Sequence, residues 1–233
     1  MVIRGKRTRV IGVSVVAKRA VDIVLAAAGL AVLAPLLACI AVMIRLDSAG
    51  PALYRQRRVG RGGSAFTMWK FRSMYDGNNQ SVHLQAADNW FDVPPNGQRY
   101  KTSADPRVTR VGRHLRRTSL DELPQLWNVL LGEMSLVGPR PVMEYERCRF
   151  ESWHLKREAV RPGITGLWQV NGRDRLSARQ MLELDVRYVH EWSLWLDFKV
   201  LVRTLPAVLD DVRSTPMIHD RAEIIPRTRP QVH

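Results

Sequence analysis

Cysteine is scarce in this chain, which has only Cys39 and Cys148 among its 233 residues. Cys39 lies inside an apolar run, and two cysteines so placed cannot build a disulfide framework or a four-ligand zinc site. The shortage therefore excludes a small disulfide-stapled secreted domain, and it favours a reducing, cytoplasmic setting.

Acidic residues are also few. The chain has 36 Lys and Arg against 22 Asp and Glu, which gives a formal charge of +14. An excess of this size indicates an anionic partner, and three kinds qualify: nucleic acid, an anionic membrane surface, or a phosphorylated small molecule. There is no internal repeat and no low-complexity tract. A length of 233 residues indicates one ordinary domain or one domain with an added segment.

One long run, residues 23–44, contains no charged residue at all. It is long enough to cross a hydrocarbon core, whereas it is too long for the apolar part of an ordinary signal peptide. Basic residues flank both ends of the run, and this bias places both ends on the cytoplasmic side. Pro35 near its middle removes a backbone donor and predicts a break in the helix. We therefore predict a basic tail over 1–14 and a re-entrant helix-break-helix segment over 15–48. A simple membrane span and a buried core helix are the alternatives.

After Gly50-Pro51 the pattern changes to that of a folded domain, predicted over 49–210. Two β-prone runs, "ALYRQRRVG" and "SAFTMWKFRSMY", are separated by "RGG" and predict a hairpin whose second strand carries Lys70. Residues 76–104 are polar and proline-containing, typical of a loop insertion. From Asp105 onward the chain is mainly helical. Helices are expected through about residue 160, over 177–191 and over 194–209, before a loosely ordered tail at 211–233.

The predicted helix over 194–209 is strongly apolar, but it also carries charged residues. Trp192 and Trp195 could anchor it flat in the headgroup region as an interfacial amphipathic helix. An ordinary core helix explains the same pattern equally well. The fold class predicted is therefore mainly α with a small β-hairpin, joined to a membrane segment.

The stretch "RRTSLDELPQLWNVL" places two adjacent acids, Asp121 and Glu122, between a basic pair and an apolar helical repeat. Ser119 and Glu122 match a capping box, so the acids could simply begin a helix. Pro124 argues against a start at Ser119 and favours a start at or just after Asp121. A carboxylate at that position, beside arginines that hold it ionised, would be available as a nucleophile or a metal ligand.

A second motif, "GPRP" at 138–141, encloses Arg140 between Pro139 and Pro141. The prolines limit the conformational freedom that the backbone loses when the guanidinium meets an anion. A purely structural proline turn is an equally good explanation. Cationic and acidic groups beside a membrane segment together indicate phosphoryl transfer on a lipid.

An ordered set of stretches carries a family resemblance: "KRAVDIVLAAAGLAVLAPLL", "GPALYRQRRVG", "MWKFRSM", "TSLDELPQL" followed by "GPRP", "RPGITGLWQVNGR" and "LDVRYVHEWSLWLDFKVL". Over about residues 15–210 the chain resembles the bacterial sugar transferases, the monotopic polyprenyl-phosphate phosphoglycosyl transferases. In layout it is similar to the short members that initiate exopolysaccharide synthesis, and it looks like a minimal catalytic module.

The resemblance implies an enzyme of the bacterial inner membrane with its catalytic domain on the cytoplasmic face. Such an enzyme moves a hexose-1-phosphate from a UDP-sugar to undecaprenyl phosphate, releases UMP, and needs Mg²⁺. It performs the first membrane step of exopolysaccharide, capsule or O-antigen assembly. The implied partners are the two substrates and membrane lipids, without nucleic acid; a homodimer is one option for the oligomeric state.

The resemblance also implies residue roles. Asp121 would be the nucleophile that forms a covalent aspartyl phosphosugar and a ligand of Mg²⁺, and Glu122 would assist in metal or proton handling. Pro35 would break the membrane helix. The substrate-binding positions implied are Arg116, Pro139, Arg140, Pro141, Lys70, Asp185 and Asp197.

The main rival is a non-catalytic, basic, membrane-tethered binding protein in which the acids only cap a helix. The net charge suits it, but the basic residues are scattered through apolar-patterned segments and no nucleic-acid-binding module is present. The residues do not indicate which UDP-sugar is used or which polysaccharide is made.

Overall fold

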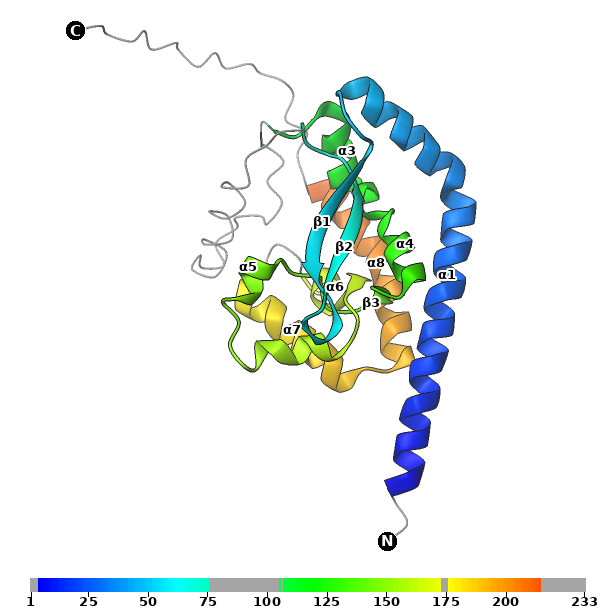
Figure 1. Ribbon diagram of the computed structural model, residues 1–233, viewed down its shortest axis with the longest axis vertical. Helices are drawn as coiled ribbons and strands as arrows, with labels where there is room; N and C mark the ends of the chain where they lie inside the picture. The colour runs from blue at the N-terminus through cyan, green and yellow to red at the C-terminus, as the bar shows by residue number, and fades with distance from the viewer. Residues whose placement is uncertain (1–3, 76–104, 106, 173–175, 215–233) are drawn as a thin grey trace, which may run out of the picture.

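The structure is a computed structural model that describes residues 4–75, 105, 107–172 and 176–214 (Figure 1). The predicted loop at 76–104 and nearly all of the predicted tail lie outside these residues. In the described part, helices dominate, and two small two-stranded sheets accompany them.

The apolar run forms part of one long helix, α1 (Arg4–Asp47), which includes residues that we assigned to a basic tail. Pro35 lies inside it, and the helix continues past Pro35 without the predicted break. Instead, its axis bends over one end of the domain (Figure 1). Among the described residues α1 is the one helix long and apolar enough to cross a membrane, by length and composition.

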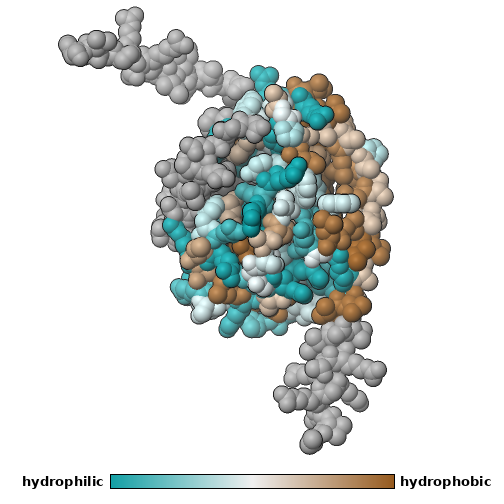
Figure 2. All heavy atoms as spheres, in the orientation of Figure 1, coloured by the Kyte–Doolittle hydropathy of each residue, from teal (hydrophilic) through white to brown (hydrophobic). Residues whose placement is uncertain are grey.

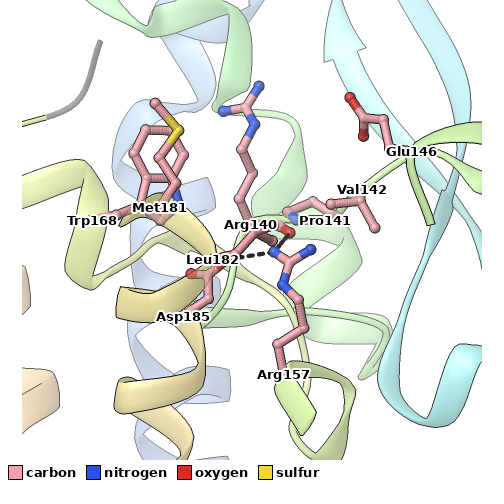
Figure 3. Close-up of a pocket in the computed structure, with 9 residues that line it drawn as sticks. All are labelled: Arg140, Pro141, Val142, Glu146, Arg157, Trp168, Met181, Leu182 and Asp185. Atoms are coloured by element: carbon pink, nitrogen blue, oxygen red, sulfur yellow. Dashed lines mark hydrogen bonds and ion pairs between the residues drawn. The ribbon is translucent and has the colours of Figure 1, made fainter. Parts of the chain in front are cut away.

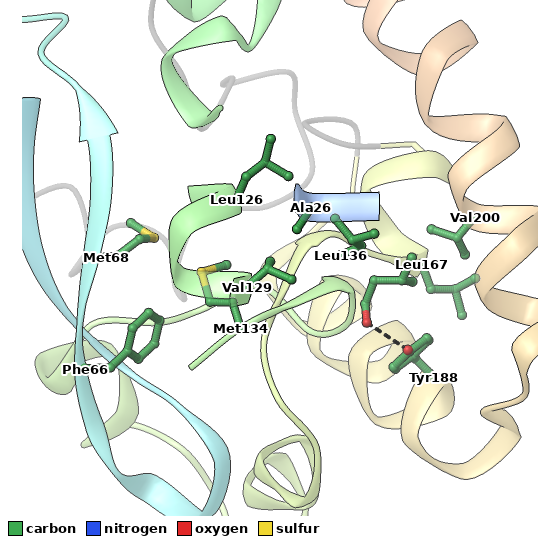
Figure 4. Packing of buried hydrophobic residues seen from close by; sticks show 11 residues of the cluster. Ala26, Phe66, Met68, Leu126, Val129, Met134, Leu136, Leu167, Tyr188 and Val200 are labelled. Atoms are coloured by element: carbon green, nitrogen blue, oxygen red, sulfur yellow. Dashed lines mark hydrogen bonds between the residues drawn. The ribbon is translucent and has the colours of Figure 1, made fainter. Parts of the chain in front are cut away.

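Helix α1 lies along the domain and contributes to its interior. Ala26 is fully buried in the main apolar cluster, which also contains Leu126, Val129, Leu167 and Val200 (Figure 4). Nearer its C-terminal end, Ile40 and Ile44 pack in a second cluster with Phe71 and Leu115. Both parts of the helix therefore contact the same domain.

The predicted hairpin is present as β1 (Leu53–Val59) and β2 (Ala65–Phe71), paired antiparallel with Leu53 opposite Phe71. The short 3-10 turn η1 (Arg61–Gly63) joins them. Gly62 and Gly63 both adopt positive φ, which glycine tolerates without strain. The hairpin places Lys70 close to the end of β2.

The acid pair lies in a connection between two helices. Helix α3 (Arg110–Thr118) is followed by the 3-10 turn η2 (Leu120–Glu122) and then by α4 (Gln125–Leu131), which ends at Gly132 with φ 83°. Trp127 is 51% exposed, whereas Leu126 and Val129 face the core.

A second sheet pairs β3 (Ser135–Val137) in parallel with β4 (Gly163–Thr165), a pairing that the sequence did not predict. The strands approach so closely that a Cβ on Gly163 would lie 2.1 Å from the backbone nitrogen of Gly138. Only glycine can occupy such a contact. The sheet fixes the start of the Pro-Arg-Pro segment, which follows β3 directly.

The remaining elements are α5 (Glu144–Arg147), the 3-10 turn η3 (His154–Ala159), α6 (Leu167–Val170), α7 (Ala178–Glu191) and α8 (Leu194–Ser214). The helices predicted over 177–191 and 194–209 are confirmed within a few residues. The continuous helix predicted through residue 160 is wrong. The Nδ1 atom of His154 accepts a bond from the Glu151 backbone N–H, and this local bond stabilises a turn instead.

Candidate active site

Asp121 and Glu122 are adjacent in η2 and both are buried, with exposed fractions of 5% and 8%. The turn is set up by Ser119, which ends α3 in the left-handed conformation with φ 57°. The Ser119 side chain makes no cap bond, so the capping box that was the alternative explanation of the acids is not formed. Helix α4 begins only at Gln125, with Pro124 as its N-cap, so the acids precede that helix rather than start it.

Two cations hold the carboxylate of Glu122. The Lys70 Nζ lies 3.2 Å from Glu122 Oε1, and the Arg140 Nη1 lies 3.9 Å from the same oxygen. All three side chains are largely buried, with exposed fractions of 18% or less. The contacts bring the hairpin, the acid pair and the Pro-Arg-Pro segment together at one place.

Arg116 completes the cationic side of the site. Burial lowers the pKa of its guanidinium, while the negative charges of Asp121, Asp105 and Glu122 act to raise it. Because Arg116 precedes η2 by one helical turn, its position is fixed by α3. The formal charges of Asp121, Glu122, Lys70, Arg116 and Arg140 sum to +1, which suits an anionic substrate.

Asp121 differs from Glu122 in its bonding. Its Oδ1 atom is buried and has no hydrogen-bond partner within the part of the chain that the structure describes. An unpaired buried carboxylate oxygen is costly, so it indicates a group that joins the site when substrate binds. A Mg²⁺ ion fits this position, because Mg²⁺ is commonly held by one or two carboxylates together with substrate phosphates. No cluster of three or more His, Cys, Asp or Glu side chains occurs among the described residues, so an all-protein metal cage is not found there.

Next to the acid pair, the Pro-Arg-Pro segment lines a small open pocket (Figure 3). The Arg140 side chain points away from Arg157 and Asp185, and the rings and chains of Trp168 and Met181 lie to one side of it. The Arg140 guanidinium carbon lies 5.9 Å from the centre of the Trp168 ring. Backbone bonds fix the flanking prolines: Gly163 N–H donates to the Pro139 carbonyl at 2.8 Å, and Arg58 donates to the Pro141 carbonyl at 3.2 Å.

Asp185 lies at the base of this pocket and is paired with Arg157. One Arg157 nitrogen donates to Asp185 Oδ2 and also to the Arg140 carbonyl oxygen (Figure 3). Burial raises the pKa of the Asp185 carboxyl to about 6, although the neighbouring Arg157 charge acts to lower it. The pair therefore supports the backbone of Arg140. We did not predict Arg157 as a site residue, because a lone arginine in "HLKREAV" carries no pattern that separates it from surface charges.

Asp197 lies elsewhere. Its carboxylate accepts bonds from Lys18 Nζ at 2.6 Å, Tyr188 hydroxyl at 2.7 Å and Trp192 Nε1 at 3.2 Å, where α1, α7 and α8 meet. The structure thus brings Asp121, Glu122, Arg116, Lys70 and Arg140 together, places Asp185 behind the Arg140 backbone, and leaves Asp197 among these helices. Pro35 lies in α1, outside the site.

Comparison with known proteins agrees with this geometry. A family model described as bacterial sugar transferase matches residues 13–211. The chain is 45% identical over 202 residues to the UDP-glucose:undecaprenyl-phosphate glucose-1-phosphate transferase of Escherichia coli strain K12, covering 83% of this chain and 40% of that protein. It is 43% identical over 197 residues to the galactosyl transferase CpsE of Streptococcus agalactiae, covering 83% of this chain and 42% of that protein.

A third relative matches over most of its own length. The exopolysaccharide production protein ExoY of Rhizobium meliloti is 39% identical over 197 residues, which cover 82% of this chain and 85% of that protein. The chain therefore spans about two fifths of the first two relatives and most of the third. The family model covers well over half of the chain, and the conclusion is direct: this protein belongs to the bacterial sugar transferase family.

Proposed function

We propose that the protein is a phosphoglycosyl transferase that moves a hexose-1-phosphate from a UDP-sugar to undecaprenyl phosphate and releases UMP. Relatives named for glucose-1-phosphate transfer to undecaprenyl phosphate support this reaction class. The observation that carries the proposal is the buried Asp121 with an unpartnered oxygen beside a glutamate held by Lys70 and Arg140.

The proposed chemistry has two displacements at one phosphorus atom. A carboxylate oxygen of Asp121 attacks the β-phosphorus of the UDP-sugar. The bond from that phosphorus to the bridging oxygen breaks, and UMP leaves with the electron pair. In the second step an oxygen of undecaprenyl phosphate attacks the same phosphorus, and the Asp121 carboxylate leaves unchanged. The products are UMP and a polyprenyl diphosphate sugar.

The cations of the site account for how the charge is handled. Phosphoryl transfer depends mainly on positioning and on neutralising charge on the phosphate oxygens. Arg116 and Arg140 offer guanidinium forks that match phosphate geometry, and Lys70 provides a point charge near Glu122. Glu122 keeps these cations in place and stays close to the reacting carboxylate.

Magnesium is part of the proposal. Asp121, together with the diphosphate of the donor, would hold the ion, and Glu122 is the next residue in the chain. When bound, Mg²⁺ neutralises charge on the diphosphate and stabilises the leaving UMP. The unpartnered Asp121 oxygen supports this assignment.

The membrane arrangement proposed is monotopic, with α1 entering and leaving one leaflet of the bacterial inner membrane from the cytoplasmic side. Just before the apolar run of α1, Lys18 and Asp22 are hydrogen-bonded to the domain, and just after it Asp47 accepts a bond from the Val111 N–H at 2.9 Å. The steps from Lys18 to Ile44 extend about 39 Å along an α-helix, enough to cross a bilayer core of about 30 Å. A spanning helix would carry its two ends to opposite sides, so one domain bonded at both ends supports re-entry.

Apolar side chains exposed on the surface support the same arrangement. They gather along α1 (Figure 2), where Val16, Val24 and Val32 are each at least 63% exposed. On α8, Trp195, Phe198, Val202, Leu205 and Leu209 are exposed at helical spacing. We propose that this second stripe lies at the membrane interface, where the family's lipid acceptor resides.

The experiment that tests the function is UMP release. Detergent-solubilised protein is incubated with undecaprenyl phosphate, Mg²⁺ and, in turn, UDP-glucose, UDP-galactose and other UDP-sugars, beside an Asp121→Asn variant. Release with one sugar, abolished by the substitution and by a chelator, is the expected result and identifies the donor. If folded protein releases no UMP with any of the sugars, the acid pair has only a structural role. That result would favour the membrane-tethered binding protein.

A further inference from the structure

Lys18 is a charged residue of α1 whose side chain turns into the protein. Its Nζ donates to Asp197 Oδ2 at 2.6 Å and to the Val137 carbonyl oxygen at 3.2 Å, and the side chain is only 17% exposed. One turn later, Asp22 accepts bonds from the Ser135 hydroxyl at 2.8 Å and the Leu136 N–H at 3.1 Å. Helix α1 therefore bonds to every residue of strand β3.

Asp197 and Tyr188 complete this network. Asp197 is 7% exposed, and Lys18, Tyr188 and Trp192 all donate to it. The Tyr188 hydroxyl lies 2.7 Å from Asp197 Oδ1 and 2.9 Å from the Val137 carbonyl (Figure 4 shows this residue in the core). Burial and the neighbouring Asp197 charge raise the pKa of Tyr188, so the hydroxyl keeps its proton and shares it between these acceptors.

The position of the Val137 carbonyl affects the site, because Gly138, Pro139 and Arg140 follow it in the chain. Gly138 N–H donates to the Thr165 carbonyl at 2.9 Å, and the two prolines restrict the backbone on either side of Arg140. Because this backbone is restrained, a displacement of β3 at Val137 also displaces Arg140. The Arg140 guanidinium lies 3.9 Å from Glu122, a separation that tolerates little displacement.

We propose that Lys18 is a positioning residue, tying α1 and α8 to the end of β3 so that Arg140 is held against Glu122. The inference rests on the proposed function, because Arg140 is assigned there to the donor phosphates. It adds a connection between the membrane-facing elements and the site. Through Lys18 and Asp197, α1 and α8 are joined to the backbone that carries Arg140. Correct seating of α1 then becomes a condition for a competent active site.

The first test compares Lys18→Met with Lys156→Met in the full chain, in detergent or nanodiscs. Lys156 is an exposed lysine of η3 that lies outside α1, α8 and β3, so its variant is a matched control. We expect Lys18→Met to lower kcat/KM for UMP release by about 10- to 100-fold, because a misplacement of about 1 Å can have effects of that size. Lys156→Met should leave the rate within twofold of wild type.

A double-mutant cycle separates positioning from simple loss of folded protein. If Lys18 acts through Arg140, adding Lys18→Met to an Arg140→Ala protein should cause little further loss, less than about threefold. Rates are normalised to folded protein by the thermal unfolding signal. Tyr188→Phe removes only the hydroxyl and should give a smaller loss of kcat/KM, again non-additive with Arg140→Ala. This second variant keeps the test valid if Lys18→Met does not fold.

The outcomes are distinguishable. Losses that multiply in the double variant, or a Lys18→Met protein with normal kcat/KM and a lowered unfolding temperature, overturn the positioning role and leave the ion pair as a structural contact. Wild-type protein that releases no UMP with any donor overturns the proposed function and this inference together. Non-additive losses beside an active wild type support both.

Discussion

Glu122 is held where it is by charge. Its carboxylate is buried, and the cations that contact it come from the hairpin (Lys70) and from the Pro-Arg-Pro segment (Arg140). Removing one partner of a buried, hydrogen-bonded pair leaves the other charge poorly compensated. The carboxylate of Glu122 therefore depends on Lys70 for its position as well as its charge balance.

A Lys70→Met substitution tests this dependence. The apolar chain keeps most of the volume but removes the cation 3.2 Å from Glu122. We expect UMP release to fall by about 100-fold, with a loss of stability of about 3 to 5 kcal/mol, the range found when one member of a buried pair is removed. Lys156→Met, at an exposed lysine of η3, is the matched control and should change neither quantity. If the Lys70→Met protein stays active, cations other than Lys70 bind the phosphate.

Asp185 gives a prediction in pH. Its carboxyl has a pKa of about 6 in the fold and about 4 in an unfolded chain, so the ionised form is the less favourable one in the folded protein. Below pH 4 both states are protonated and there is no cost. As the pH rises through 6 the cost develops fully and reaches about 3 kcal/mol. The wild type should thus lose stability over this window relative to an Asp185→Asn variant.

The measurement is denaturant unfolding in detergent, followed by tryptophan fluorescence at several values between pH 4 and pH 7. The difference in unfolding free energy between wild type and variant should change steadily with pH, in favour of the variant at the higher values. Parallel curves would mean that the Arg157 charge compensates Asp185 fully and that the carboxylate stays ionised throughout.

At the residue scale, the sequence predicted which residues form the site better than it predicted which residues contact one another. Asp121, Glu122, Arg116, Lys70 and Arg140 were identified from motifs and from the family resemblance, and they do lie together. Asp197 was assigned to the substrate, but its main partner Lys18 is 179 residues away in the chain. Spacing within a motif carries no information about such a contact, since it depends on how α1 packs against α8.

Among the elements, α8 shows most directly what periodicity can and cannot predict. Its apolar pattern suited an interfacial helix and a core helix equally. The structure shows Trp195, Phe198 and Val202 exposed on one side and Val200 buried on the other. The short strands β3 and β4 could not be predicted, because three residues are too few for a pattern and their pairing joins segments far apart in sequence.

Spin labels on α8 test its proposed place at the interface. With Cys39 and Cys148 replaced by serine, single cysteines at Phe198, Val202 and Leu205 are labelled in nanodiscs. Labels at these positions should collide more with oxygen, which concentrates in hydrocarbon, than with a water-soluble nickel complex. A label at the exposed Arg179 of α7 should show the opposite preference. Nickel accessibility at all four positions would mean that the α8 stripe faces water.

For the whole molecule, the important question is how a long apolar helix and a basic domain share one membrane surface. The domain contacts α1 at Ala26 and again at Ile40 and Ile44, while Val16, Val24 and Val32 of the same helix are exposed. In the monotopic arrangement that we propose, the net charge of +14 suits an anionic membrane surface, to which basic surfaces are attracted. The fold itself, a helical domain with a hairpin, was predicted; the continuous α1 with a bend at one end was not.

Cysteine accessibility distinguishes re-entry from a span. In the same cysteine-free background, Ser14→Cys and Pro51→Cys are probed with a membrane-impermeant maleimide in intact spheroplasts and in inverted inner-membrane vesicles. Re-entry predicts that both sites react only in the inverted vesicles, because both ends of the apolar segment are cytoplasmic. Reaction of one site in each preparation would establish a spanning helix.

The most direct test of the whole account is a single-turnover reaction without acceptor. Purified protein, Mg²⁺ and the active UDP-sugar are mixed without undecaprenyl phosphate, and UMP, the intact protein mass and the masses of its proteolytic peptides are measured. The account predicts a burst of at most one UMP per protein and a matching mass gain of one hexose phosphate on the peptide containing Asp121, both absent in Asp121→Asn. Turnover with acceptor present, but neither burst nor adduct without it, would contradict Asp121 as the nucleophile.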